Sequence, residues 1–161
     1  MHRTIKAQKL TVEGFRPFGD FCNFLQPEGH NLGDFFHDKL LDPMEKCTPF
    51  GFSPLIAHKR EKMIITAAEY HNHTPEILVP LDSDIVIHVA PASNGIVPEK
   101  TQAFIVPKGT GVRLNTGVFH LCPFSIEKEE GHVLVALPER TYFNDCIVCD
   151  YEEKDYIEIT L

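Results

Sequence analysis

Short runs of β-branched and aromatic residues, each bounded by Gly, Pro, Asp or Asn, recur along this chain and constrain its fold most. Such runs are typical of strands, and the residues at their ends are typical of turns. No stretch of 12 or more residues keeps a helical period of apolar side chains. Many short strands at regular spacing predict an all-β sandwich or closed barrel.

The predicted strands extend from one end of the chain to the other. Thr11 follows a first strand over 4–10 and is placed to cap a short helical turn before Pro17. From residue 21 to 54 the pattern is irregular and predicts short strands and loops that cover one end of a barrel. The remaining predicted strands are 63–65, 76–81, 85–90, 103–106, 111–114, 122–126, 132–137 and 156–160.

Length and composition predict a single cytoplasmic domain over residues 1–161. Pro and Gly are spread throughout rather than gathered into a linker. No apolar run approaches the roughly 18 residues that span a bilayer, and the N-terminus lacks the apolar region of a signal peptide. A net charge of −8 without a Lys/Arg cluster argues against nucleic acid as a partner.

The five cysteines do not suggest a disulfide framework, because their number is odd and they are scattered. Cys146 and Cys149 have the C-x-x-C spacing, but no second pair completes a structural zinc site. Strand alternation would place these two sulfurs on opposite faces, and we interpret both as structural.

The densest polar cluster runs from Glu69 to Glu76, directly before an apolar run. Strand alternation predicts that His71 and His73 project from one face, with Glu69 beside them. Two imidazoles on one face can share a metal or flank an anionic substrate. Glu76 has the wrong parity for that face, but Pro75 marks a bend or bulge that would aim it inward.

A second segment ends in His120, some 44 residues after Glu76, and its Gly117 permits a tight turn. An H-x-H-x-x-E segment followed by G-x-x-H resembles the two motifs of the cupin superfamily. That resemblance implies a double-stranded β-helix, also called a jelly-roll barrel. It also implies a divalent metal held by His71, His73, Glu76 and His120.

Nearly the whole chain resembles the ureidoglycolate lyase family. The similar segments are LTVEGFRPFGD at 10–20, EYH at 69–71, VPL at 79–81, VIHVAP at 86–91, AFI at 103–105, KGTGV at 108–112, GVFH at 117–120 and NDC at 144–146. This resemblance implies a homodimeric cupin that splits ureidoglycolate into glyoxylate and urea in purine degradation. It also implies that His71 and His120 are catalytic.

Three departures from the family pattern change the charge and hydrogen bonding of the expected pocket. The family usually has Gln at the position of Glu76 and a small or apolar residue at that of His73. It usually has a second His where this chain has Leu121. The resemblance therefore predicts the fold of this chain more firmly than it predicts the substrate.

The predicted chemistry needs a base, an acid and a site for a carboxylate. Histidine suits either proton-transfer role because its ordinary pKa lies near 6.5. Glu69, Arg113 and Arg140 are the candidate substrate-binding residues, since an arginine binds a carboxylate bidentately. A site of imidazoles and one carboxylate suits Ni, Zn, Mn or Fe.

Three functions stay open at this point. The first is a carbon–nitrogen lyase acting on ureidoglycolate or a related small hydroxy acid. The second is a metal-binding cupin that acts as an isomerase or oxygenase on a sugar or similar metabolite. The third is a module that binds a small ligand without turnover. His88 lies in an alternating strand and, of the remaining histidines, is the first candidate to face the interior of the barrel.

Overall fold

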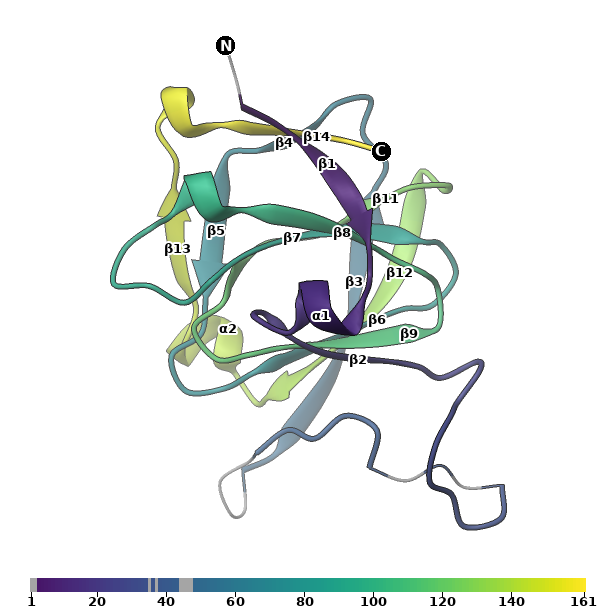
Figure 1. The fold of residues 1–161 in the computed structure, drawn as a ribbon. Helices are drawn as coiled ribbons and strands as arrows, with labels where there is room; N and C mark the ends of the chain where they lie inside the picture. Colours follow the sequence, from purple (N-terminus) through teal and green to yellow (C-terminus); the bar gives the residue numbers. More distant parts are fainter. Residues whose placement is uncertain (1–2, 35, 37, 44–47) are drawn as a thin grey trace.

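The computed structural model describes residues 3–34, 36, 38–43 and 48–161, and its strands form two sheets (Figure 1). The nine-stranded sheet has the order β13-β5-β10-β7-β8-β1-β14-β4, with β11 also paired to β7. Its strands are β13 (Ile147–Asp150), β5 (Ala67–Tyr70), β10 (Phe119–His120), β7 (Ile85–Ala90), β8 (Gln102–Val106), β1 (Arg3–Lys9), β14 (Ile157–Thr160), β4 (Met63–Ile65) and β11 (Phe124–Ser125).

The five-stranded sheet is antiparallel throughout and has the order β2-β9-β6-β12-β3. Its strands are β2 (Gly19–Asn23), β9 (Thr110–Leu114), β6 (Glu76–Pro80), β12 (Glu130–Pro138) and β3 (Phe50–His58). The helical elements are short: α1 (Val12–Phe15), η1 (Pro98–Lys100), α2 (Thr141–Asn144) and η2 (Glu153–Asp155).

The larger sheet curls back on itself. Strand β4 pairs with β14 at one end of the sheet order, whereas β5 pairs with β10 near the other end. Only Thr66 separates β4 from β5 in the chain, so the two ends of the order must meet. The result is a cupin-like β-sandwich with one sheet closed into a half-barrel, which confirms the predicted fold class.

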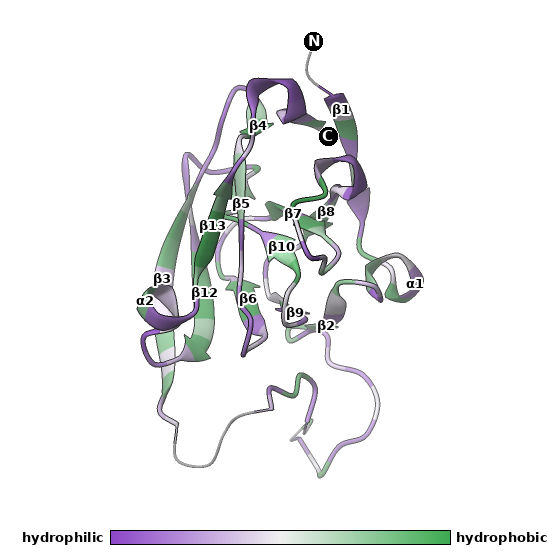
Figure 2. Ribbon diagram, turned by 90° about the vertical axis from the view of Figure 1, so that its left-hand side faces the viewer, coloured by the Kyte–Doolittle hydropathy of each residue, from purple (hydrophilic) through white to green (hydrophobic). Residues whose placement is uncertain are grey.

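Strand β7 has an apolar core on each of its faces. Ile85, Ile87 and Val89 pack into the core between the two sheets, and Val86 and Ala90 pack into a second core inside the curled sheet. Because successive strand side chains point to opposite faces, this strand reads as a continuous apolar run. Figure 2 shows hydrophobic colouring along β7 and β8.

The short helical turn expected after the first strand is present as α1. The Thr11 side chain accepts a hydrogen bond from the backbone N–H of Gly14 at 3.1 Å, which satisfies one of the free donors of the helix. Phe15 of this turn is fully buried in the core between the sheets.

The strands that the sequence pattern missed include β3 and β5. β3 contains Gly51 and Pro54, which weaken a strand signal, but it is an edge strand, where proline is tolerated. β5 is only four residues long and begins with two alanines, which have low strand propensity. Among the described residues, no helix is long and apolar enough to cross a membrane.

Candidate functional site

Glu76 lies between two imidazole rings. Its Oε2 atom accepts hydrogen bonds from His71 Nε2 at 2.9 Å and from His120 Nε2 at 3.1 Å. The two rings meet edge to face with centroids 5.2 Å apart. All three residues are buried. One carboxylate oxygen thus links two histidines from separate parts of the chain.

The two sheets place these groups in the space between them. His120 on β10 is paired with Glu69 on β5 and with Val89 on β7, so all three side chains share the inward face. Glu76 opens β6 in the facing sheet. Glu69, His71, Glu76 and His120 are called the histidine–carboxylate cluster below.

The outer nitrogen of each imidazole is bound to a backbone carbonyl. His71 Nδ1–H donates to the carbonyl oxygen of Asp145 at 2.6 Å, and His120 Nδ1–H donates to that of Val118 at 2.9 Å. Both rings therefore present Nε2 to the centre of the cluster. When Nε2 also carries a proton and donates to Glu76, the ring is an imidazolium.

The charges of the cluster stabilise one another. Burial alone would raise the pKa of Glu76, but the charge of His120 and the hydrogen bonds from both rings outweigh it and lower this pKa to about 2. Burial opposes protonation of His71 and His120, yet their contacts with Glu76 raise both pKa values above the ordinary value. An ionised Glu76 thus favours protonated imidazoles.

Glu69 is the most exposed member of the cluster, with a quarter of its side chain accessible. Its Oε1 lies 4.0 Å from His120 Nε2, and its Oε2 accepts a hydrogen bond from the Cys146 thiol at 3.0 Å. Burial and this bond to Glu69 raise the pKa of Cys146 to about 12, so the thiol keeps its proton.

The cluster also has the donors for a divalent metal. Glu69, His71 and His120 each offer a ligand atom, and these atoms lie within 4.8 Å of one another. Neutral imidazoles with Nδ1–H on a backbone carbonyl keep Nε2 free as a ligand, which is the usual arrangement around protein-bound metals. The residues present therefore fit a metal ion with mixed nitrogen and oxygen ligands.

The prediction that His73 shares an inward face with His71 is wrong. β5 ends at Tyr70, so strand alternation does not extend to either histidine. The His73 side chain is 84% exposed, and its Nδ1 donates to Asp145 Oδ1 at 3.1 Å. Among the predicted metal ligands, His71, Glu76 and His120 come together and His73 does not, whereas Glu69 joins the group.

Glu76 reaches the cluster by a different route from the one expected. The parity argument assumed one continuous strand through His71 and Glu76, re-aimed by Pro75. Instead, the chain leaves one sheet after Tyr70 and enters the other at Glu76, whose face it shares with the core residue Leu78. Two facing sheets, rather than a bulge, bring the carboxylate to the histidines.

The structure does not bring the two predicted substrate-binding arginines to the cluster. Arg113 alternates with the core residues of β9 and so faces away from them; it donates to Asn115 Oδ1 at 2.9 Å. The Arg140 side chain is 67% exposed, and its Nε lies 3.5 Å from Glu139. Both stay predictions as carboxylate-binding groups, without a contact to the cluster among the described residues.

His88 is buried but faces away from the cluster. It shares the side of β7 that carries Val86 and Ala90, not the inward side that carries Val89. Burial, with a smaller contribution from the charge of His120, lowers the pKa of His88 to about 3, so it is neutral. His88 was expected to face the interior of the barrel. It does face an apolar core, but this is the second core inside the curled sheet and not the space that contains the cluster.

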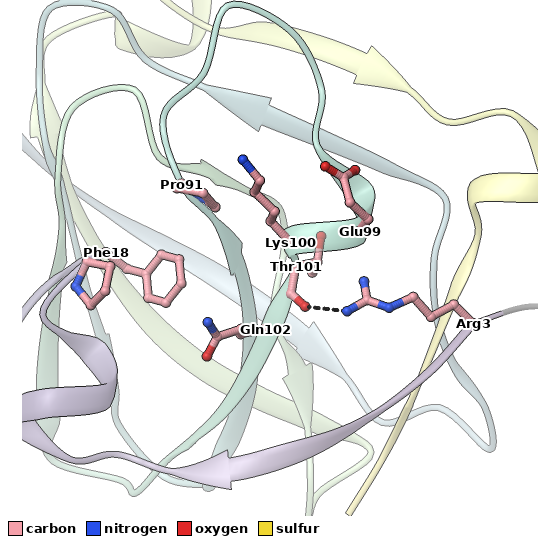
Figure 3. A pocket seen from close by; sticks show the side chains of 8 residues that line it. Arg3, Phe18, Pro91, Glu99, Lys100, Thr101 and Gln102 are labelled. Carbon is pink, nitrogen blue, oxygen red and sulfur yellow. Dashed lines mark hydrogen bonds between the residues drawn. The ribbon is translucent and has the colours of Figure 1, made fainter.

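A separate hollow lies beside η1 and β8 (Figure 3). Arg3 donates there to the backbone carbonyls of Pro98 at 2.6 Å and Thr101 at 3.4 Å. The hollow contains none of the residues predicted for the site. Its other labelled side chains are Phe18, Pro91, Glu99, Lys100 and Gln102.

Two residues that contact the cluster were not predicted as site residues. Asp145 and Cys146 precede β13, which pairs with β5 so that Val148 lies opposite Glu69. Their contacts span 74 and 77 residues of sequence, a separation that local patterns do not reveal. The only sequence signal was the NDC segment at 144–146, which carried part of the family resemblance.

Known proteins resemble this chain over most of its length. A model of the ureidoglycolate lyase family matches residues 2–158. The chain is 29% identical over 143 residues to a ureidoglycolate lyase of Pseudomonas paraeruginosa, with 83% of each chain covered. It is 28% identical over 140 residues to one of Pseudomonas aeruginosa PAO1, with 83% of each covered. It is 25% identical over 143 residues to one of Pseudomonas fluorescens Pf0-1, with coverages of 83% and 84%.

Proposed function

This chain belongs to the ureidoglycolate lyase family, and we propose that it cleaves ureidoglycolate, or a closely related ureido acid, to glyoxylate and urea. The observation that carries the proposal is the buried Glu76 carboxylate held between His71 and His120. Such a cluster provides adjacent groups that can take up and release protons. The Pseudomonas relatives are named ureidoglycolate lyases.

The reaction needs two proton transfers. A base removes the hydroxyl proton of ureidoglycolate, and the resulting oxygen electrons form the C=O bond of glyoxylate. The carbon–nitrogen bond breaks, its electron pair leaves with the urea nitrogen, and an acid protonates that nitrogen. One proton is taken up and one is released, so the enzyme returns to its initial state.

The two imidazoles can divide these roles. In the reactive form one ring is neutral and accepts the hydroxyl proton, while the other is an imidazolium and donates to the leaving nitrogen. Glu76 stabilises positive charge on either ring because its Oε2 contacts both. The carbonyls of Asp145 and Val118 hold the rings with Nε2 toward Glu76.

The test is release of glyoxylate and urea from ureidoglycolate by the purified protein. His71→Ala and His120→Ala should each lower kcat by about 10²-fold or more, the usual contribution of a general acid or base, while circular dichroism stays unchanged. His132→Ala is the matched control, since His132 is half-exposed and bonds Asp82 on the surface. No product from the wild type, or unchanged turnover by His120→Ala, would overturn the proposal.

A second function is favoured by the metal-fitting geometry of Glu69, His71 and His120. In that case the protein is a metal-dependent cupin acting on another small hydroxy acid or sugar. A bound Ni, Zn, Mn or Fe ion would polarise a substrate oxygen as a Lewis acid. Metal analysis of the purified protein distinguishes the two. Stoichiometric metal without glyoxylate release supports the second function, and glyoxylate release without metal supports the first.

A further inference from the structure

We propose that Asp145 is a positioning residue, which fixes the loop after β5 and thereby holds the His71 imidazole in its working orientation. Its effect on turnover rests on the proposed function, whereas its effect on the His71 ring does not. Asp145 touches neither Glu76 nor the space between the imidazoles in any described contact. Its described route to the cluster is therefore through His71.

His71 needs an external support because it lies outside a strand. β5 ends at Tyr70, and β6 begins at Glu76, so the intervening loop has no strand ladder to hold it. Besides its contact with Glu76, two described hydrogen bonds hold His71 in place. Its backbone carbonyl accepts from Gly117 N–H at 2.8 Å, and its Nδ1–H donates to the Asp145 carbonyl at 2.6 Å.

The Asp145 carboxylate binds the next two residues of the same loop. Asn72 N–H donates to Oδ1 at 2.9 Å, and His73 N–H donates to Oδ2 at 2.8 Å. His73 Nδ1–H adds a third bond to Oδ1 at 3.1 Å. Only 11% of the Asp145 side chain is exposed, although its partners Asn72 and His73 lie at the surface. Charge-assisted bonds of this kind are stronger than bonds between neutral groups.

Carbonyl and carboxylate of one residue thus act together. The carboxylate fixes the backbone of Asn72 and His73, and the carbonyl fixes the ring of His71. A carbonyl accepts but cannot donate, so it selects the tautomer with a proton on Nδ1. That tautomer leaves Nε2 facing Glu76 in the neutral ring.

The pairing of β13 with β5 explains how a residue so distant in sequence reaches this loop. Ile147 lies opposite Tyr70 in the antiparallel register, and the segment before Ile147 therefore passes beside the loop that follows Tyr70. β13 and β5 lie side by side in both views (Figures 1 and 2). The same register brings the Cys146 thiol to Glu69 Oε2, to which it donates a hydrogen bond at 3.0 Å.

The test compares Asp145→Ala and Asp145→Asn with a matched control, Asp82→Ala. Asp82 also accepts from the backbone N–H of a histidine, His132, and from its ring Nδ1, at 2.8 and 2.9 Å. Removing either carboxylate frees one anchored backbone segment. Of these two aspartates, only Asp145 is connected to the cluster. A general loss of stability should therefore lower the activity of both alanine variants. A loss of His71 positioning should lower the activity of Asp145→Ala alone.

We expect Asp145→Ala to lower kcat for ureidoglycolate by about 10-fold to 100-fold with a smaller change in KM, because small misplacement of a reacting group is costly. Asp145→Asn keeps one acceptor oxygen and should recover part of kcat. Asp82→Ala should keep the wild-type kcat. Unchanged kcat in Asp145→Ala, or an equal loss in Asp82→Ala, would overturn the proposal.

A second measurement does not depend on the reaction. Histidine ¹⁵N spectra recorded at alkaline pH, where the ring is neutral, report the tautomer of His71, assigned by its loss in His71→Ala. Amide exchange reports the protection of Asn72 and His73. We expect Asp145→Ala to mix the His71 tautomers and to speed both amide exchanges at least 10-fold. If wild-type protein does not cleave ureidoglycolate, the proposed function fails while this measurement still decides the positioning role. Unchanged His71 signals would refute it.

Discussion

Glu76 shows how a charge can be kept inside this protein. A buried carboxylate is costly unless it is paired and hydrogen-bonded. Here one oxygen accepts bonds from His71 and His120, and each ring has a backbone carbonyl at its other nitrogen. Each contact stabilises the charged form of its partner. The cluster is therefore a coupled unit, and a change in one member should alter the others.

Glu76→Gln tests this coupling. Glutamine has nearly the same shape without the charge, so the pKa values of His71 and His120 should fall. NMR titration of the ring protons measures both. The loss of two charge-assisted hydrogen bonds should lower the free energy of unfolding by about 2 kcal/mol or more.

The pH dependence of that loss follows from the directions of the pKa shifts. The pKa of Glu76 falls from 4.5 to about 2 in the folded protein, so its stabilisation is complete above pH 4.5 and is lost as the pH falls. The raised pKa values of the histidines stabilise the fold below pH 6.5, and this part is lost as the pH rises. The difference between wild type and Glu76→Gln should therefore be greatest between pH 4.5 and 6.5.

Urea unfolding across this range measures the difference. Glu130→Gln is the control, because Glu130 is an exposed residue at the start of β12. A difference between wild type and Glu76→Gln that is flat from pH 4 to pH 8 would show that Glu76 does not interact with the histidines as charges.

At the scale of elements, the turn between β9 and β10 supports both histidines. Gly117 has φ of +80°, a left-handed conformation that other residues rarely adopt. Its N–H donates to the carbonyl of His71, and the turn leads directly into His120. The sequence therefore predicted the turn from Gly117, while the contact of that turn with His71 arises from tertiary packing.

Gly117→Ala should destabilise the protein by about 1–2 kcal/mol, the cost of a left-handed conformation for a residue with a Cβ. The new Cβ would also lie 3.1 Å from the Ala92 side chain. Thermal unfolding measures the loss, and the kcat of the variant should fall as well, because the turn holds His71. Gly95→Ala is the control, since a Cβ at Gly95 meets nothing within 4 Å. Equal stability of the two variants would contradict this account of the turn.

At the scale of the whole molecule, the cluster depends on two sheets meeting face to face. Glu69 and His120 come from the curled sheet, and Glu76 comes from the facing one. A metal bound by Glu69, His71 and His120 would bind the folded protein and not the separated segments. Binding to the folded state alone raises stability by about 2.7 kcal/mol at a ligand concentration 100 times Kd.

We therefore expect Ni²⁺ or Zn²⁺ to raise the unfolding temperature by roughly 5–10 °C, the shift that such a free energy produces in a domain of this size. Differential scanning fluorimetry with and without EDTA measures it. His120→Ala should abolish the shift, whereas His73→Ala should keep it, since His73 lies outside the cluster. An equal shift in wild type and His120→Ala would place the metal elsewhere.

The sequence by itself determined the fold class, most strands and the two histidines that meet at Glu76. Alternating short strands must bury one face, and this requirement follows from local spacing alone. His71 and His120 were recognisable because each belongs to a motif read along a single segment. Glu76 was recognisable by its motif, although the reason for its inward direction was wrong.

Only the tertiary structure decided which side chains share the site. The chain leaves its strand at Tyr70, so His73 turns to solvent and Asp145, while Glu69 stays beside His120. The Asp145 contact depends on the register of β13 against β5, more than 70 residues apart in sequence. Local sequence specifies how a strand alternates, but where a strand ends and what lies opposite depend on the packing of the entire chain.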